Sequence, residues 1–76
     1  MDLSPETVET TIKVYLSQMR VRLDEAASIA KAAEACADAG NISKGIEIAL
    51  DVEQLLYEVN TFLNAASLII RLGKSQ

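Results

Sequence analysis

The sequence contains no histidine, no tryptophan and a single cysteine, Cys36. A lone cysteine cannot form a disulfide within the chain, and without histidine or a second thiol a structural zinc site lacks its usual ligands. General acid–base catalysis would fall to carboxylates, and no imidazole is present to activate the Cys36 thiol. The acidic residues follow the spacing of solvated helix faces. We therefore expect no enzymatic activity, no metal site and no cofactor.

The sequence also lacks a long apolar run. The uncharged stretch from Val59 to Ile70 covers 12 residues and includes Asn60 and Asn64, whereas a membrane span needs about 20 apolar residues. The opening stretch MDLSPETVE has neither the basic nor the apolar region of a secretory signal. With the free Cys36, these features favour a cytoplasmic location and no membrane association.

Basic residues are few. Seven lysines and arginines stand against 11 aspartates and glutamates, for a net charge of −4. A nucleic-acid interface needs a dense basic face. We expect no direct contact with nucleic acid.

A chain of 76 residues predicts one domain, spanning 1–76. Domains of this size bury only about 60% of the unfolded surface on folding and often need a disulfide, a metal or a partner. Since the first two are excluded, stability must come from helix packing or from association with another chain.

Proline and glycine are rare, so the places where they occur mark the element boundaries. Ser4 followed by Pro5 is typical of an N-cap and first helical position. Gly40 suits the left-handed position after a helix, and Asn41 or Ser43 can cap the next one. The predicted boundaries are a helix at about 5–38, a turn at about 39–43, a second helix at about 44–72 and a frayed tail at 73–76.

Apolar residues recur every three or four positions in both predicted helices, which is the spacing of one helical stripe. The first stripe is Val8, Ile12, Tyr15, Met19, Leu23, Ala26, Ala30, Ala33 and Ala37, and the second is Ile48, Val52, Leu55, Val59, Phe62, Ala66 and Ile69. The short connection makes the two helices antiparallel neighbours. The prediction is an all-α helical hairpin whose alanine-rich end, near the turn, permits close approach.

A three-helix bundle is the alternative. The first helix would be long for so small a protein, and Asp24 in RLDEAAS could act as an internal N-cap. The stripe keeps its phase across Leu23 and Ala26, which favours one continuous helix.

A second apolar row lies roughly opposite the main stripe of the second helix. Its members are Ile46, Leu50, Tyr57, Leu68 and Leu72, and the first helix adds a weaker outside row of Val14, Val21 and Ile29. Contiguous exposed apolar residues usually mark an interaction surface. A third helix, a second copy forming a dimeric four-helix bundle, or a different protein could cover the row. Tyr57 is the best anchor candidate, because tyrosine is enriched at binding hot spots.

The opening LSPETVETTIKVYL and the closing LDVEQLLYEVNTFLNAASLIIRL, with the length and acidic balance of the chain, resemble the QseM-type antiactivators of rhizobial integrative and conjugative elements. The resemblance implies a small helical protein that binds transcriptional activators and represses conjugative transfer genes. The implied partners are a LuxR-type quorum-sensing regulator and an activator with a helix-turn-helix-like domain. It assigns no individual binding residue.

The resulting hypothesis is an antiactivator that occludes its partner through Ile46, Leu50, Tyr57, Leu68 and Leu72, with Val14 and Val21 on the first helix. The alternative is a homodimeric helical-bundle scaffold without a regulatory target. The sequence leaves open which activator is bound and which step is blocked.

Overall fold

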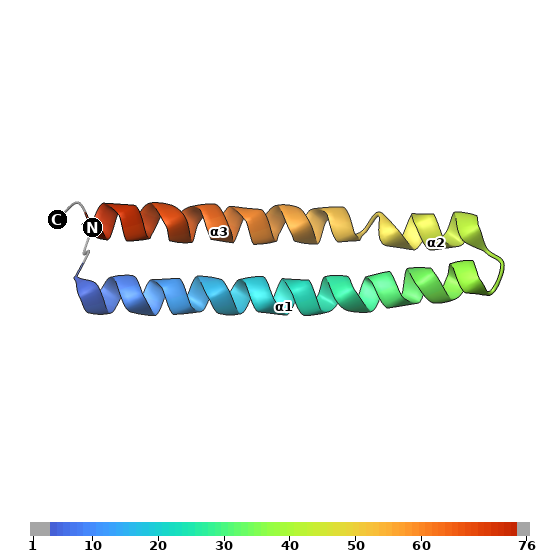
Figure 1. Cartoon of the computed structure of the whole chain (residues 1–76), viewed down its shortest axis with the longest axis horizontal. Helices are drawn as coiled ribbons and strands as arrows, with labels where there is room; N and C mark the ends of the chain where they lie inside the picture. The colour runs from blue at the N-terminus through green and yellow to red at the C-terminus, as the bar shows by residue number, and fades with distance from the viewer. Residues whose placement is uncertain (1–3, 75–76) are drawn as a thin grey trace.

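Two antiparallel helical arms lie side by side along their whole length (Figure 1). The computed structural model describes residues 4–74. One arm is the helix α1 (Pro5–Asp38), and the other consists of α2 (Ile42–Ala49) followed by α3 (Val52–Lys74). The hairpin measures 57 × 14 × 14 Å. The predicted all-α hairpin is confirmed, whereas the three-helix alternative with a break at Asp24 is wrong, because α1 is continuous through that residue.

Local capping explains where α1 begins. The Ser4 side chain accepts a hydrogen bond from the Thr7 backbone N–H at 3.2 Å, and Pro5 occupies the first helical turn. This is the arrangement that Ser-Pro predicts, since proline has no N–H to leave unsatisfied there.

The turn between the arms is built on Gly40 and Asn41. Gly40 has φ +96°, which glycine adopts without a steric penalty. The Asn41 backbone N–H donates to the Cys36 carbonyl at 2.9 Å, and the Asn41 side chain accepts from the Lys44 N–H at 3.1 Å. The second arm therefore starts at Ile42, two residues earlier than predicted.

The second arm is not one continuous helix, as predicted, but is interrupted at Leu50 and Asp51. Here the Asp51 N–H donates to the Ile48 carbonyl and the Glu53 N–H to the Leu50 carbonyl, both at 3.1 Å. In each of these hydrogen bonds the donor lies three residues after the acceptor, instead of four as in an α-helix, and this tightens the backbone locally. Aspartate is a weak helix former, and the interruption separates α2 from α3. The direction of the arm is unchanged (Figure 1).

The contact between the arms follows a strict seven-residue repeat. Its positions are Val8, Ile12, Tyr15, Met19, Arg22, Ala26, Ile29, Ala33 and Cys36 on α1, and Gly45, Ile48, Val52, Leu55, Val59, Phe62, Ala66, Ile69 and Gly73 on the other arm. All are buried or half-buried. Such a repeat is typical of an antiparallel coiled coil.

The repeat corrects the predicted stripe of α1. Leu23 and Ala30 are exposed, and Arg22 and Ile29 take their places between the arms. A stripe drawn with 3.6 residues per turn turns slowly away from the partner helix. The residues that stay in contact with the partner recur every 3.5 residues on average. Ile29 is therefore an interface residue and not part of an outside row.

The two arms approach each other closely near the turn. A Cβ atom built on Gly45 would lie 2.8 Å from the Ala33 carbonyl oxygen and 3.4 Å from the Ala37 Cβ. Toward the open end the rings of Tyr15 and Phe62 pack at 5.6 Å between centroids. The prediction that the alanine-rich end permits close approach is confirmed.

The core is thin. Among the described residues, the buried apolar side chains are Ala26, Ala33, Leu55 and Ala66, and no large side chain is completely enclosed. The chain exposes 5491 Å², and its unfolded form would expose about 11,900 Å² for this mass. Folding thus buries only about 54% of the surface, which is less than even small domains usually bury.

Candidate protein-interaction surface

One side of the hairpin is closed by a polar cluster centred on Arg22. Its Nε donates to Glu58 Oε1 across the arms at 2.7 Å, and its Nη1 donates to Gln18 Oε1 at 2.7 Å. The guanidinium carbon lies 4.7 Å from the centre of the Phe62 ring, within cation–π range. The cluster therefore ties α1 to α3 and shields the middle of the interface.

Glu58 is held in its charged form by this cluster. Hydrogen bonds from Gln54 and then from Arg22 lower the pKa of Glu58 below 4.5. The Gln54 amide donates to Glu58 Oε2 at 2.9 Å, so both carboxylate oxygens have donors. Glu58 therefore has a structural role, because Oε1 holds the two arms together and Oε2 is hydrogen-bonded within α3.

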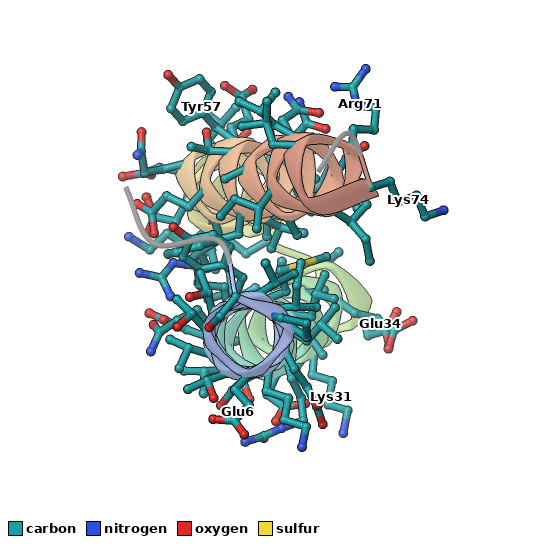
Figure 2. The ribbon with its side chains drawn as sticks, turned by 90° about the vertical axis from the view of Figure 1, so that its left-hand side faces the viewer. Glu6, Lys31, Glu34, Tyr57, Arg71 and Lys74 are labelled. Carbon is teal, nitrogen blue, oxygen red and sulfur yellow. The ribbon has the colours of Figure 1, made fainter. Side chains whose placement is uncertain are left out.

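The five residues of the second arm that were predicted to bind a partner are all exposed. We call this set the outer row, and it consists of Ile46, Leu50, Tyr57, Leu68 and Leu72. Tyr57 is 68% exposed and points away from α1 (Figure 2). An 11-residue spacing separates Ile46, Tyr57 and Leu68, whereas the contact between the arms repeats every seven residues. Because the two spacings differ, the outer row winds slowly around the back of the second arm.

Val14 and Val21 do not join the outer row. Both are exposed, but they lie on α1, and the outer row lies on the side of the second arm that faces away from α1. Val14 borders a shallow depression with Thr10, Lys13 and Ser17. The structure therefore separates the seven predicted partner-binding residues into two surfaces.

A further apolar surface was missed by the sequence analysis. We call it the side face, and it consists of Leu16, Leu23, Ala30 and Ala37 on α1 and Ile42, Ala49, Leu56, Leu63 and Ile70 on the other arm. Every large member is exposed. On each arm the members recur every seven residues, next to the interface positions. This seven-residue spacing is visible in the sequence, whereas a stripe with 3.6 residues per turn does not include all of these positions.

The two halves of the side face meet on one side of the hairpin. Glu9, seven residues before Leu16, lines the same groove as Ile70. Arg22, Gln18 and Glu58 occupy the opposite side. In the view along the hairpin, Lys74 on α3 and Glu34 on α1 extend on the same side of the molecule (Figure 2).

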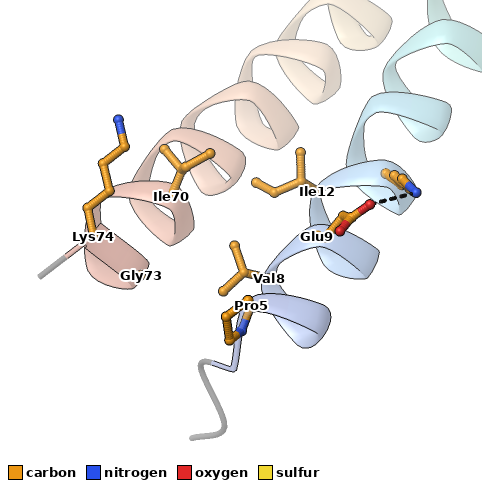
Figure 3. Close-up of a pocket in the computed structure, with 8 residues that line it drawn as sticks. Pro5, Val8, Glu9, Ile12, Ile70, Gly73 and Lys74 are labelled. Atoms are coloured by element: carbon orange, nitrogen blue, oxygen red, sulfur yellow. Dashed lines mark ion pairs between the residues drawn. The ribbon is translucent and has the colours of Figure 1, made fainter. Parts of the chain in front are cut away.

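An open groove of about 480 Å³ forms the end of the side face farthest from the turn. Val8, Ile12 and Ile70 supply its apolar walls, and Gly73 leaves space beside Val8 (Figure 3). The ion pair between Lys13 and Glu9, at 2.9 Å, forms its rim. The groove can accept an aliphatic side chain.

The remaining described residues contain one thiol and no candidate metal site. Cys36 is half-buried at an interface position and packs between the arms. Across residues 4–74, no three histidine, cysteine, aspartate or glutamate side chains are placed to hold a metal ion. Within the same range no helix is long and apolar enough to cross a membrane.

The chain was compared with protein-family models, curated proteins and solved structures. None of the three comparisons found a match.

Proposed function

We propose that this chain is a regulatory protein-interaction module, an antiactivator that binds a transcriptional activator and occludes a surface the activator needs. The observation that carries the proposal is the outer row, which leaves Tyr57 and four aliphatic side chains exposed on a preformed helical arm. Aligned apolar residues on a helical arm are suited to a groove or a helix of another protein.

The proposed mechanism is stoichiometric. Tyr57 would supply large contact area at a small entropic cost, with Leu50 and Leu68 packing on either side of it. Because the arm is already helical, binding would not require folding of the interface, which lowers the cost of association. Occlusion needs no catalytic group and no basic surface, and the chain carries a net charge of −4.

The activator as partner comes from the resemblance to QseM-type proteins. It names a LuxR-type quorum-sensing regulator and a helix-turn-helix-like activator as targets, with repression of conjugative transfer genes as the outcome. The proposal extends these partners to this chain, and the outer row supplies a surface for them.

The test uses a purified LuxR-type activator bound to its operator DNA. Addition of the chain should release the DNA in an electrophoretic mobility assay, and Tyr57→Glu combined with Leu68→Glu should abolish the release. A matched control, Ser28→Glu with Ala35→Glu, adds two charges to exposed positions of α1 and should leave the release intact. Circular dichroism verifies that both variants remain helical. Full activity of the outer-row variant would contradict the proposed surface.

The homodimeric scaffold is the second candidate function. The side face favours self-association, and it does so at residues other than the outer row. The two activities can therefore be separated by variants of different surfaces.

A further inference from the structure

We propose that the side face binds a second copy of this chain, with the turns of the two hairpins at opposite ends, to form an antiparallel four-helix bundle. A two-fold axis would pass between the copies at the level of Leu23 and Leu56. These residues lie at one level of the hairpin, because Arg22, next to Leu23, pairs with Glu58, two residues after Leu56. This inference does not depend on the proposed function, which uses the outer row.

The exposed area of the single hairpin supports a partner of this size. The chain exposes 5491 Å², whereas a compact monomer of 8.2 kDa would expose about 4500 Å². The excess of about 1000 Å² is close to the roughly 800 Å² that each partner buries in a standard stable interface. Covering the side face would reduce this excess.

The order of large and small residues along the side face fits an antiparallel second copy. On α1, Leu16 and Ala30 lie seven residues on either side of Leu23, and on the other arm Leu63 and Ala49 lie seven residues on either side of Leu56. Leu16 and Leu63 thus form a leucine layer, and Ala30 and Ala49 form an alanine layer. Rotation about the proposed axis places the leucine layer of each copy on the alanine layer of the other. Alternation of this kind lets facing layers interdigitate.

A parallel arrangement, with both turns at the same end, lacks this fit. It would place Leu16 of one copy on Leu63 of the other, and Ala30 on Ala49. Leucine layers would then hold the copies apart where the alanine layers leave a gap, and such a void loses packing contacts.

The groove at the open end has a matching projection at the turn end. Ile42 and Ile70 each lie 14 residues from Leu56. The proposed rotation therefore places Ile42, which is 67% exposed, over the groove lined by Ile70, Val8 and Ile12 (Figure 3). The interface would contain this knob-and-groove contact twice.

Charges along the edge of the side face are complementary in the same arrangement. Lys13 lies ten residues before Leu23 and Glu34 lies 11 residues after it. The rotation thus brings Lys13 of one copy to within about one residue, or about 1.5 Å along the helix, of the level of Glu34 of the second copy. Two such pairs would border the interface and favour this register over a shifted one.

The first experiment measures molar mass by light scattering behind a sizing column over a wide range of concentrations. The wild-type chain should have twice the mass of a single 8.2 kDa chain. Leu56→Glu should halve that mass, whereas Tyr57→Glu, at the adjacent and also exposed position, should not change it. A monomer at every concentration would overturn the inference, and so would a Leu56→Glu variant that remains dimeric.

A disulfide-trapping experiment tests the orientation and does not depend on a disruptive variant. Leu23→Cys in a Cys36→Ser background should oxidise rapidly to a covalent dimer, because the two copies of this position meet at the axis. Ser28→Cys in the same background, on an exposed position of α1 outside the side face, should not. The parallel arrangement instead places position 23 against position 56, so failure of Leu23→Cys to cross-link would overturn the antiparallel bundle.

Discussion

The guanidinium of Arg22 on α1 donates to the carboxylate of Glu58 on α3 at 2.7 Å, across an interface whose repeat otherwise consists of apolar residues and glycine. Both side chains are only partly exposed, at 24% and 33%. The ion pair fixes the level of one arm against the other, because a shift by one helical turn would leave both charges without their partners. A polar contact in the middle of the thin apolar interface therefore specifies the register of α1 against α3.

Replacing Arg22 separates its packing role from its charge. Arg22→Ala removes the aliphatic stem and the cation–π contact with Phe62, so we expect a loss of about 1 kcal/mol in the free energy of unfolding. Arg22→Met retains most of the packing volume and removes the charge, so we expect a smaller loss than in Arg22→Ala. Urea denaturation of both variants measures the difference. An equal loss in both would show that charge, and not packing, dominates.

Stability should depend on pH through Glu58. The pKa of Glu58 is lowered in the folded chain from a value of 4.5, so this carboxylate stabilises the fold above the unfolded pKa. The contribution should be lost as pH falls from about 4.5 through the lowered pKa of the folded state. Thermal melting at fixed protein concentration should show Glu58→Gln melting below the wild type at neutral pH, with the two curves converging in acid. A difference that persists unchanged in acid would contradict this assignment.

Gly45 should be intolerant of alanine despite the higher helix propensity of alanine. The added methyl group would lie 2.8 Å from the Ala33 carbonyl oxygen, a backbone atom that cannot move alone. We expect Gly45→Ala to lower the free energy of unfolding by about 1–3 kcal/mol. Gly73→Ala is the control, because its methyl group would meet Val8 at an ordinary 3.5 Å. Equal stability of the two variants would show that the arms separate near the turn at little cost.

Leu55 and Leu56 are sequence neighbours with opposite environments. Leu55 is buried between the arms, and Leu56 is 50% exposed on the side face. Leu55→Ala should cost about 2–5 kcal/mol, as in other cores, and unfold much of so thin a hairpin. Leu56→Ala should leave the helical signal of a dilute sample unchanged. Circular dichroism during urea titration checks both expectations, and similar losses at low concentration would contradict them.

Much of the fold follows from local features of the sequence. Ser4 and Pro5 predict the start of α1, and Gly40 predicts the turn, because these residues have strong positional preferences that tertiary packing does not override. All seven residues of the predicted second-arm stripe lie at the interface or are half-buried there. The hairpin was therefore predictable from capping, spacing and the rarity of glycine.

The details that were missed depend on the partner arm. A helix considered alone predicts a stripe with 3.6 residues per turn and so places Leu23 inside and Ile29 outside. Packing against α3 changes the repeat to seven residues and brings Arg22 and Ile29 into the interface. An arginine at an interface position has no apolar signal, and its acceptor Glu58 lies 36 residues away in the chain.

The two candidate surfaces differ in the same way, because one can be predicted from a single helix and the other depends on both arms. The outer row was visible as an excess of apolar residues on one helix. The side face was not, because its two halves come from different arms and each half alone, such as Leu56, Leu63 and Ile70, is a sparse row. The interruption at Leu50 and Asp51 was also missed, because the weak helix propensity of one aspartate does not by itself predict a break.

The central claim is that the outer row binds a transcriptional activator, and calorimetric titration of a LuxR-type activator with the chain at several temperatures tests it most directly. The account predicts saturable binding with a negative heat-capacity change, the mark of buried apolar surface, and loss of that binding in the Tyr57→Glu, Leu68→Glu variant. It also predicts that Leu56→Glu, which alters only the side face, still binds. Absence of binding by the wild-type chain, or undiminished binding by the outer-row variant, would contradict the claim.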